Sequence, residues 1–214
     1  MAHFNSNIPG YSPLISKLRN MSDRTRNNIG GRVGIWVDDS YESEVLDNLS
    51  IFKDKFFESV LIKIKIGKNK FKIIGNIYKP PGNDISRFND NLNEILLLIS
   101  NDQNLCKASE IQLLDDFNIN LLNRNNHTGT SEFLDILLSN GLLPLITLPS
   151  CSTPTSSTLV DNIFSNSKEK FSDSGLIYSC LSDYWPVFHI SPIIKDKKSS
   201  RIQKHCRDNF KHNL

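Results

Sequence analysis

The sequence predicts one domain of the α+β or layered α/β sandwich class, and three observations support this. The chain has 214 residues, of which 38% are hydrophobic, so it can bury one sizeable core. Apolar and polar residues alternate over short runs, which is the pattern of half-buried strands. Two other stretches repeat apolar residues at helical spacing. Strands in hairpins, with helices between some of them, favour such a layered fold.

For residues 1–78 the sequence predicts a loop followed by strands. Residues 1–30 are polar and interrupted by Pro and Gly, so they are expected to form a loop. Residues 32–37 suit a strand. Residues 60–66 alternate, residues 67–69 turn the chain, and residues 71–78 form a second strand, which together make a hairpin.

Two helices are predicted in the rest of the chain. Asp84 or Ser86 can cap the first, because either side chain accepts from the exposed amides of the first turn. Thr130 or Ser131 starts the second, and Gly141 fits its C-terminal stop. The predicted core positions are Phe88, Leu92, Ile95, Leu96 and Ile99 in the first helix, and Phe133, Leu134, Leu137 and Leu138 in the second. Further strands are expected at 110–114, 158–164, 175–180 and 187–190.

Charge is unevenly distributed along the chain. The net charge is +2, but residues 195–214 hold seven Lys or Arg and two Asp, hence +5, which leaves −3 on residues 1–194. This basic tail is interpreted as a solvated linker, not as a nucleic-acid-binding surface. No apolar run approaches the ~20 residues of a membrane span, and the N-terminus lacks the apolar core of a signal peptide. No membrane association and a nuclear or cytoplasmic location are therefore expected.

The four cysteines are expected to be free thiols. None forms a CxxC pair, and no Cys/His cluster has the spacing of a zinc site. A disulfide framework does not suit a chain of this length without a secretory signal. The cysteines are Cys106, Cys151, Cys180 and Cys206.

Three acidic segments stand where predicted strands begin or end. Asp116 and Asn118 are two residues apart, so on an extended chain they point the same way and can orient a water. Asp161 lies in an apolar strand, and Asp183 precedes a strand that Pro186 starts. Three converging acids would suit a divalent cation and phosphoryl chemistry. Taken singly, each is more simply explained as a strand-end residue that satisfies loop backbone groups.

The order of five segments gives these acids a context. Residues 31–37, 76–81, 114–119, 158–164 and 181–188 form a series that resembles the endonuclease/exonuclease/phosphatase domain of LINE-type (non-LTR) retrotransposons, which is related to apurinic endonucleases and DNase I. The resemblance covers roughly residues 8–192. It implies a four-layer, DNase I-like α/β sandwich that lacks its first strands. The chain then divides into an irregular segment (1–30), a truncated endonuclease domain (31–192) and a basic tail or linker (193–214).

The resemblance also implies roles for individual residues, a Mg²⁺ cofactor and a DNA substrate. In that family an Asp/Asn pair orients the attacking water, and a His supported by an Asp contacts the phosphate. By position, Asp116 and Asn118 match the water-orienting pair, Tyr78 a phosphate-contacting Tyr, Asp161 the acid that supports the His, Asp183 the metal-side acid before that His, and Thr153 and Ser182 substrate-contacting residues.

Two substitutions depart from the family pattern at the site itself. Tyr184 stands where the family has the catalytic His, and a phenol with a pKa near ~10 stays neutral at pH 7. His189 lies five residues further on, an odd offset that should turn it to the opposite face. Asp115 stands where the family has Gly, which adds a like charge and a side chain beside Asp116.

Two further departures concern the phosphate and the metal. Relatives usually carry an Arg near Cys151 and Ser152. The family's metal-ligating Glu lies on a strand that precedes the matched segments, and the acids available nearby do not match it. These acids are Asp38, Asp39, Glu42 and Glu44.

Three hypotheses follow from these departures. The first is a retrotransposon endonuclease remnant with impaired catalysis. The second is an active divalent-metal nuclease or phosphodiesterase with altered ligands, and Mg²⁺-dependent nicking abolished by Asp116→Ala would distinguish it. The third is a non-enzymatic module that binds nucleic acid or protein, which the acidic body disfavours for nucleic acid. A phosphatase or sphingomyelinase role fits the superfamily, but the 76–81 and 158–164 segments favour the retrotransposon branch.

Overall fold

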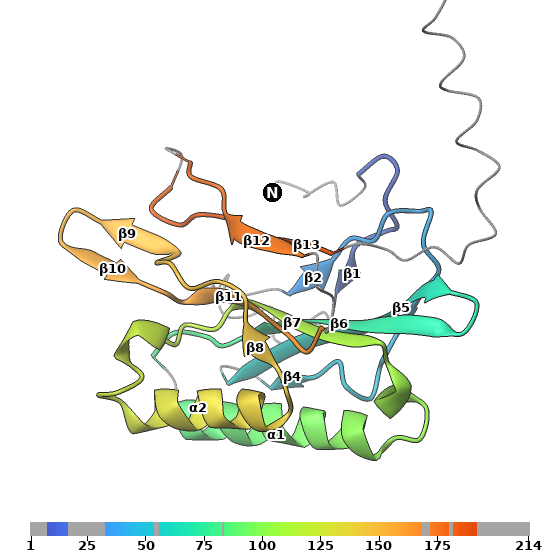
Figure 1. The fold of residues 1–214 in the computed structure, drawn as a ribbon, viewed down its shortest axis with the longest axis horizontal. Helices are drawn as coiled ribbons and strands as arrows, with labels where there is room; N and C mark the ends of the chain where they lie inside the picture. Colours follow the sequence, from blue (N-terminus) through green and yellow to red (C-terminus); the bar gives the residue numbers. More distant parts are fainter. Residues whose placement is uncertain are drawn as a thin grey trace, which may run out of the picture.

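A computed structural model describes residues 8–16, 33–53, 56–82, 84–167, 172–179 and 182–191 of the chain. Its centre is a seven-stranded mixed sheet with the order β3-β5-β6-β7-β11-β8, in which β4 also pairs with β5 (Figure 1). The β6–β7 pair is parallel, and the other pairs of this sheet are antiparallel. The strands are β3 (Ser43–Val45), β4 (Phe52–Lys53), β5 (Phe57–Gly67), β6 (Lys70–Tyr78), β7 (Glu110–Asp116), β8 (Leu143–Pro144) and β11 (Asp161–Ser165).

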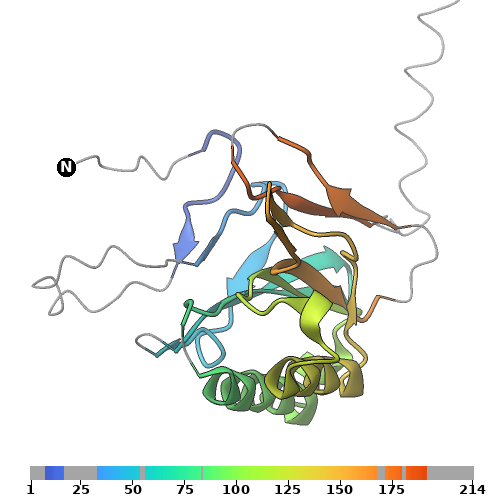
Figure 2. The ribbon, with the colours of Figure 1, turned by 90° about the vertical axis from the view of Figure 1, so that its left-hand side faces the viewer.

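Two helices, α1 (Ile85–Asn101) and α2 (Thr128–Ser139), cover one face of this sheet (Figures 1 and 2). Asp84 caps α1 by accepting from the Ser86 amide at 2.9 Å, which decides between the two predicted caps. The predicted start of α2, Thr130 or Ser131, was wrong by two or three residues, because His127 accepts from the Thr130 amide and so caps the helix earlier. Two short 3₁₀ helices, Leu105–Lys107 and Leu121–Asn123, precede β7 and α2 respectively.

The opposite face of the sheet carries a second layer of short strand pairs (Figure 2). These are β1 (Ile15–Ser16) with β2 (Gly34–Ile35), β12 (Asp173–Leu176) with β13 (Val187–Ile190), and the hairpin of β9 (Cys151–Thr153) with β10 (Ser156–Thr158). The prediction of a loop through residue 30 was wrong at β1, whereas residues 1–7 and 17–30 lie outside the described part. The strand predicted at 158–164 is divided between β10 and β11.

The main core lies between the helices and the sheet. All five residues predicted to be core positions of α1 are buried, as are Phe133, Leu134 and Leu137 of α2. Leu138 was also predicted to be in the core, but it is 46% exposed. Five phenylalanines pack in series through this core: Phe57, Phe88, Phe133, Phe117 and Phe164.

The core on the second layer's side is smaller and partly polar. Its apolar cluster has four buried members, Val33, Val37, Val60 and Ile62. Because Leu61 faces the helices and Val60 and Ile62 face the second layer, β5 is buried on both sides there and not half-buried as predicted.

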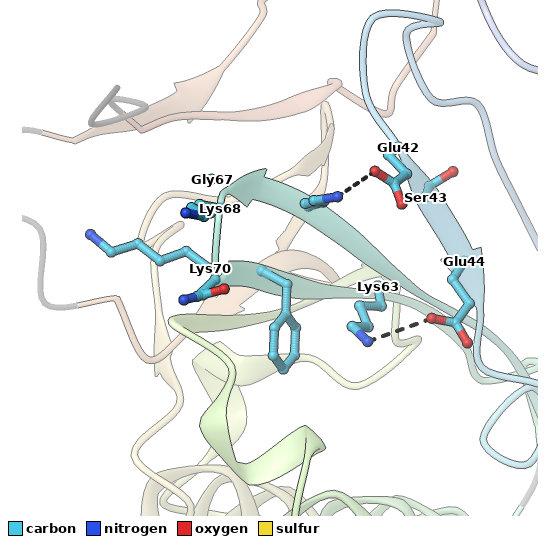
Figure 3. Close-up of a pocket in the computed structure, with 10 residues that line it drawn as sticks. Glu42, Ser43, Glu44, Lys63, Gly67, Lys68 and Lys70 are labelled. Carbon is cyan, nitrogen blue, oxygen red and sulfur yellow. Dashed lines mark hydrogen bonds and ion pairs between the residues drawn. The ribbon is translucent and has the colours of Figure 1, made fainter. Parts of the chain in front are cut away.

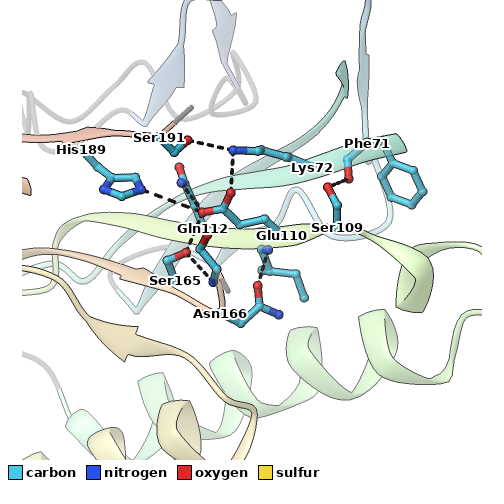
Figure 4. Close-up of polar contacts among 11 residues, drawn as sticks. Phe71, Lys72, Ser109, Glu110, Gln112, Ser165, Asn166, His189 and Ser191 are labelled. Atoms are coloured by element: carbon cyan, nitrogen blue, oxygen red, sulfur yellow. Dashed lines mark hydrogen bonds and ion pairs between the residues drawn. The ribbon is translucent and has the colours of Figure 1, made fainter. Parts of the chain in front are cut away.

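A buried polar cluster joins β13 to the sheet (Figure 4). The Glu110 carboxylate lies 2.5 Å from Lys72 Nζ, accepts from Ser165 Oγ at 2.7 Å, and lies 4.0 Å from His189 Nε2. Burial raises the pKa of Glu110, but the hydrogen bonds outweigh it and hold the pKa below its ordinary value. Glu110 and Asp116 stand at opposite ends of β7, about 20 Å apart. His189 is therefore remote from Asp116 and does not join the predicted site residues there.

The described residues thus form three layers: helices, the mixed sheet, and strand pairs. The second helix layer of a four-layer sandwich is not among them. No helix in the described ranges is long and apolar enough to cross a membrane. Cys106 and Cys151 are free thiols, as predicted; Cys180 and Cys206 lie outside the described residues.

Candidate functional site

The ends of β6, β7 and β11 bring the predicted site residues together. Asp161 is the Cα partner of Asp116 across the antiparallel β11–β7 pair. Side chains two apart on a strand share a face, so Asp116 lies on the face of Gln112 and Glu110, toward the second layer. Tyr78, the last residue of β6, packs against the cluster on that same face. Asp116, Asp161 and Tyr78 therefore lie at the same end of the sheet.

Asp116 and Asn118 form one local unit. The Asn118 amide donates to Asp116 Oδ1 at 2.9 Å, and the Asn118 side-chain nitrogen donates to the Lys79 carbonyl at 2.9 Å. Asn118 has a φ of +47°, a left-handed conformation that Asn tolerates better than most residues. Between them Phe117 is 1% exposed and anchors the unit in the main core. The two polar side chains are thus held in place by a buried aromatic ring.

Ser150 holds Asp161, and it was missed by the sequence reasoning. Its hydroxyl donates to Asp161 Oδ2 at 2.8 Å and accepts from the amides of Asp161 at 3.0 Å and Val160 at 3.2 Å. Ser150 is fully buried. It is eleven residues from Asp161 in sequence, and a serine in a predicted loop carries no signal of this contact.

The Ser150→Ala variant is expected to lower the free energy of unfolding by about 1 to 3 kcal/mol, because it leaves buried partners unsatisfied. Urea unfolding followed by circular dichroism measures this loss. Ser139→Ala is the matched control, since the Ser139 hydroxyl bonds only an exposed helix carbonyl. Equal stability of the two variants would show that Ser150 does not support Asp161.

Tyr184 occupies the site from the segment before β13. It bridges to Cys151, and the Trp185 amide donates to the Ser150 carbonyl at 2.8 Å. The pKa of Tyr184 is raised, first by the Cys151 thiol, then by burial and by the charges of Asp116 and Asp161. The phenol is therefore neutral at pH 7 and lies within electrostatic reach of both acids.

Three predicted site residues take no part in this group of contacts. The Asp183 side chain is exposed, and its main-chain carbonyl accepts from Ser152. Ser182 Oγ accepts from the Tyr184 amide at 3.1 Å, and Thr153 Oγ1 accepts from the Ser156 amide at 3.1 Å. Both hydroxyls thus serve local turns, and the predicted convergence of Asp183 with the other two acids is not observed.

Two charged residues near Tyr78 were also missed. Lys79 is 4% exposed, and Glu58, the Cα partner of Tyr78, is 4% exposed as well. Burial is the largest cause of the raised pKa of Tyr78, and Asp116 and Glu58 add to it. Lys79 lies in the 76–81 segment, but nothing in the sequence of that segment indicates that the residue is buried.

The site contains three carboxyl groups whose charged form is destabilised by burial. Burial raises the pKa of Asp115 to about 7, and it also raises the pKa values of Asp116 and Asp161. Ser150 opposes the shift at Asp161, and Asn118 and Lys79 oppose it at Asp116. Asp115 has a φ of 155°, in the region that favours glycine. The backbone at Asp115 therefore has a conformation that glycine adopts more readily than aspartate.

The donors present do not make up the magnesium centre that the resemblance implies. In the described part of the chain, no three His, Cys, Asp or Glu side chains are grouped to hold an ion. Asp161 and Asp116 are the two neighbouring carboxylates, and both already accept hydrogen bonds, Asp161 from the Ser150 hydroxyl and Asp116 from the Asn118 amide. Asp183, the implied metal-side acid, is exposed.

A surface pocket of about 440 Å³ lies at the other end of the β5–β6 hairpin (Figure 3). Lys65 pairs with Glu42 at 2.7 Å, and Lys63 pairs with Glu44 at 3.5 Å. Exposed pairs of this kind contribute roughly 0 to 1 kcal/mol. Since the length of β6 separates this pocket from Tyr78 by ~25 Å, the pocket is not part of the candidate site.

Comparison with known proteins identifies the fold. No protein-family model and no curated protein matches the sequence. The chain is similar to the endonuclease domain of TRAS1, a telomere-specific non-LTR retrotransposon, with a TM-score of 0.60 and 16% identity over 86% of this chain and 79% of that one.

Two bacterial structures share the same architecture. A mannosyl-6-phosphatase from Bacteroides thetaiotaomicron has a TM-score of 0.52 and 15% identity over 86% of this chain and 78% of its own. An endonuclease/exonuclease/phosphatase family protein from the same organism has a TM-score of 0.50 and 16% identity over 84% and 74%. The predicted DNase I-like α/β fold is thus confirmed. At these identities the likeness is one of fold, and proteins of that fold act on different substrates.

Proposed function

Since the chain has the endonuclease/exonuclease/phosphatase fold, we propose that it belongs to the LINE-type retrotransposon branch of that family and is a catalytically impaired DNA endonuclease. Five ordered sequence segments support the branch. The ancestral reaction is Mg²⁺-dependent hydrolysis of a DNA phosphodiester, which nicks the target site. A nuclear or cytoplasmic location is part of the proposal.

The proposal of impaired catalysis rests on one observation: Tyr184 lies beside Asp116 and Asp161, at the position where the family has an imidazole. An imidazole can become cationic near pH 7 and so bind or polarise a phosphate. The pKa of Tyr184 is raised above its ordinary value, so its phenol stays neutral and donates one hydrogen bond at most. The site then keeps the residues that would orient water but lacks the imidazole that would bind or polarise the phosphate.

Plasmid nicking tests this proposal. The full chain, supplied with Mg²⁺ or Mn²⁺ and supercoiled plasmid, is expected to nick no faster than the buffer. Tyr184→His is expected to remain inactive as well, because the described residues group no ligands for the metal. A metal-dependent DNA endonuclease of the same fold serves as the positive control. Robust nicking by the wild-type chain that Asp116→Ala abolishes would instead establish an active nuclease with altered ligands.

A binding role without catalysis is the remaining candidate. The −3 charge of residues 1–194 opposes phosphate binding, whereas the basic tail favours it. Salt-dependent DNA binding by the full chain that survives charge reversal of the tail lysines would support binding by the folded part. Binding that disappears with those charges would assign it to the tail.

A further inference from the structure

The β12–β13 pair lies on the mixed sheet as a separate layer (Figure 2). Among the described residues its two strands bond to each other, and no strand of the mixed sheet pairs with either of them. Neither strand contains a residue that is buried as a whole. Because a two-stranded sheet by itself is only marginally stable in water, the pair depends on side-chain contacts with the layer beneath it.

These side-chain contacts are partly apolar and partly polar. Leu176 and Val187 pack against the main core, and both are only partly buried. Ser174 Oγ donates to the Leu145 carbonyl at 3.0 Å, at an exposed position. Water can replace such a hydrogen bond when the pair separates from the sheet, so its net contribution to docking is small.

His189 is the residue of β13 that is buried against the sheet, beside Glu110 (Figure 4). Its side chain is 5% exposed, and neither ring nitrogen makes a hydrogen bond to another described residue. The distance of 4.0 Å from Nε2 to the Glu110 carboxylate is too long for a hydrogen bond. A buried polar atom without a partner destabilises the state that buries it. The docked position of β13 is therefore destabilised by this ring, and separation releases the ring into water.

The charged residues beneath His189 keep their partners without β13. The Glu110 carboxylate pairs with Lys72 Nζ at 2.5 Å and accepts from Ser165 Oγ at 2.7 Å, and all three residues belong to the mixed sheet. Separation of β13 breaks the bond from Lys72 Nζ to Ser191 Oγ at 2.9 Å, which water can replace. The buried carboxylate thus stays compensated whether or not the pair is docked.

We propose that the β12–β13 pair is a lid on the polar face of the mixed sheet, and that it opens as a unit while the helices and the sheet stay folded. The unpartnered ring of His189 favours opening, and the Lys72–Glu110 ion pair keeps the sheet stable in the open state. Elements with few buried apolar contacts are those that open at a low free energy. The lid lies on the face that carries Asp116 and Asp161, but its opening does not depend on the proposed function.

Native-state hydrogen exchange of the full chain, followed by mass spectrometry at neutral pH, tests this. In the wild-type chain the amides of β12 and β13 are expected to exchange at least on the order of tenfold faster than those of β5 and β6. His189→Leu is expected to slow exchange in β12 and β13 on the order of tenfold, because the new side chain has no polar atom to leave without a partner.

Ile95→Val is the matched control in the main core. Ile95 is fully buried in α1, and its contacts are the same whether the lid is closed or open. The loss of one methylene is therefore expected to speed exchange in β5 and β6 several-fold, on the order that Ile→Val substitutions in cores produce. Exchange in β12 and β13 should not change, because it proceeds through the opening of the lid.

Two results would overturn the proposal. One is equal exchange of the two strand pairs in the wild type with the same response of both to Ile95→Val, which would mean that the lid unfolds only with the whole chain. The other is a His189→Leu variant that exchanges as fast as the wild type or faster. If that variant lacks the circular dichroism spectrum of the wild type, His189→Met takes its place. Plasmid nicking by the wild-type chain would refute the proposed impairment but would leave this inference standing.

Discussion

The Asp115→Gly variant is expected to be more stable than the wild-type chain at pH 8, because relief of backbone strain contributes about 1 to 3 kcal/mol and loss of the buried charge adds to it. Asp115 has a φ of 155°, which glycine adopts without strain, and its carboxyl is disfavoured in the charged form by burial. The greater chain entropy of glycine when unfolded offsets about 1 kcal/mol of the gain. Urea unfolding at pH 8 measures the difference.

The charge contribution has a defined pH dependence. The pKa of Asp115 is about 7 in the folded chain and about 3.9 when unfolded. Between these values the folded state binds more protons, so wild-type stability falls as pH rises from 4 to 7 and then levels. Asp115→Asn keeps the side chain but cannot ionise, so its advantage over the wild type should be larger by about 4 kcal/mol at pH 8 than at pH 4.

The two variants separate backbone strain from charge. Asp116 and Asp161 also have raised pKa values and give every variant a residual slope, so only differences from the wild type are interpreted. Asp90→Asn, at an exposed position of α1, controls for a general change in net charge. Parallel pH curves for the wild type and Asp115→Asn would contradict the charge argument, and equal stability of the Asn and Gly variants would contradict the strain argument.

Phe133→Ala is expected to lower the free energy of unfolding by about 3 to 5 kcal/mol. Phe133 is fully buried in α2, with ring centroids 6.1 Å from Phe88, 5.4 Å from Phe117 and 5.6 Å from Phe164. Its removal leaves a cavity where both helices meet the sheet, which the surrounding rings cannot fill. The midpoint of urea unfolding, with the slope fixed, measures the loss.

The matched control for this cavity is Leu138→Ala on the same helix. Leu138 is 46% exposed, so its truncation should stay within about 0.5 kcal/mol of the wild type. Similar losses for both variants would mean that α2 does not pack through Phe133. Because Phe117 contacts Phe133 and separates Asp116 from Asn118, the cavity should also loosen the candidate site.

Most regular elements could be predicted because their signals are local. The β5–β6 hairpin and α1 carry their periodicity within one continuous segment, and Gly141 has the positive φ that its place after α2 requires. β1 could not be predicted in this way. Its two residues are a strand only because they pair with Gly34 and Ile35, and that contact depends on the tertiary fold.

The candidate site was predictable to the extent that strand ends define it. Asp116 and Asp161 lie close together because β7 and β11 are neighbouring strands, whereas the sequence predicted only that acids at strand ends would converge. Ser150 and Lys79 were missed because each contacts a segment that is distant in the sequence. Asp183 was misplaced because the orientation of a side chain before a strand depends on the loop, and the hydrogen bond to Ser152 fixes that loop through the backbone alone.

The two faces of the sheet have separate roles, and this has an evolutionary consequence. The phenylalanine series stabilises the face toward the helices, whereas Tyr78, Asp116, Asp161 and Tyr184 belong to the other face. A substitution at Tyr184, which is 49% exposed, leaves that aromatic series untouched. The residues that stabilise the fold and those that would carry a reaction therefore differ, so substitutions at the candidate site can accumulate over many generations without loss of the architecture.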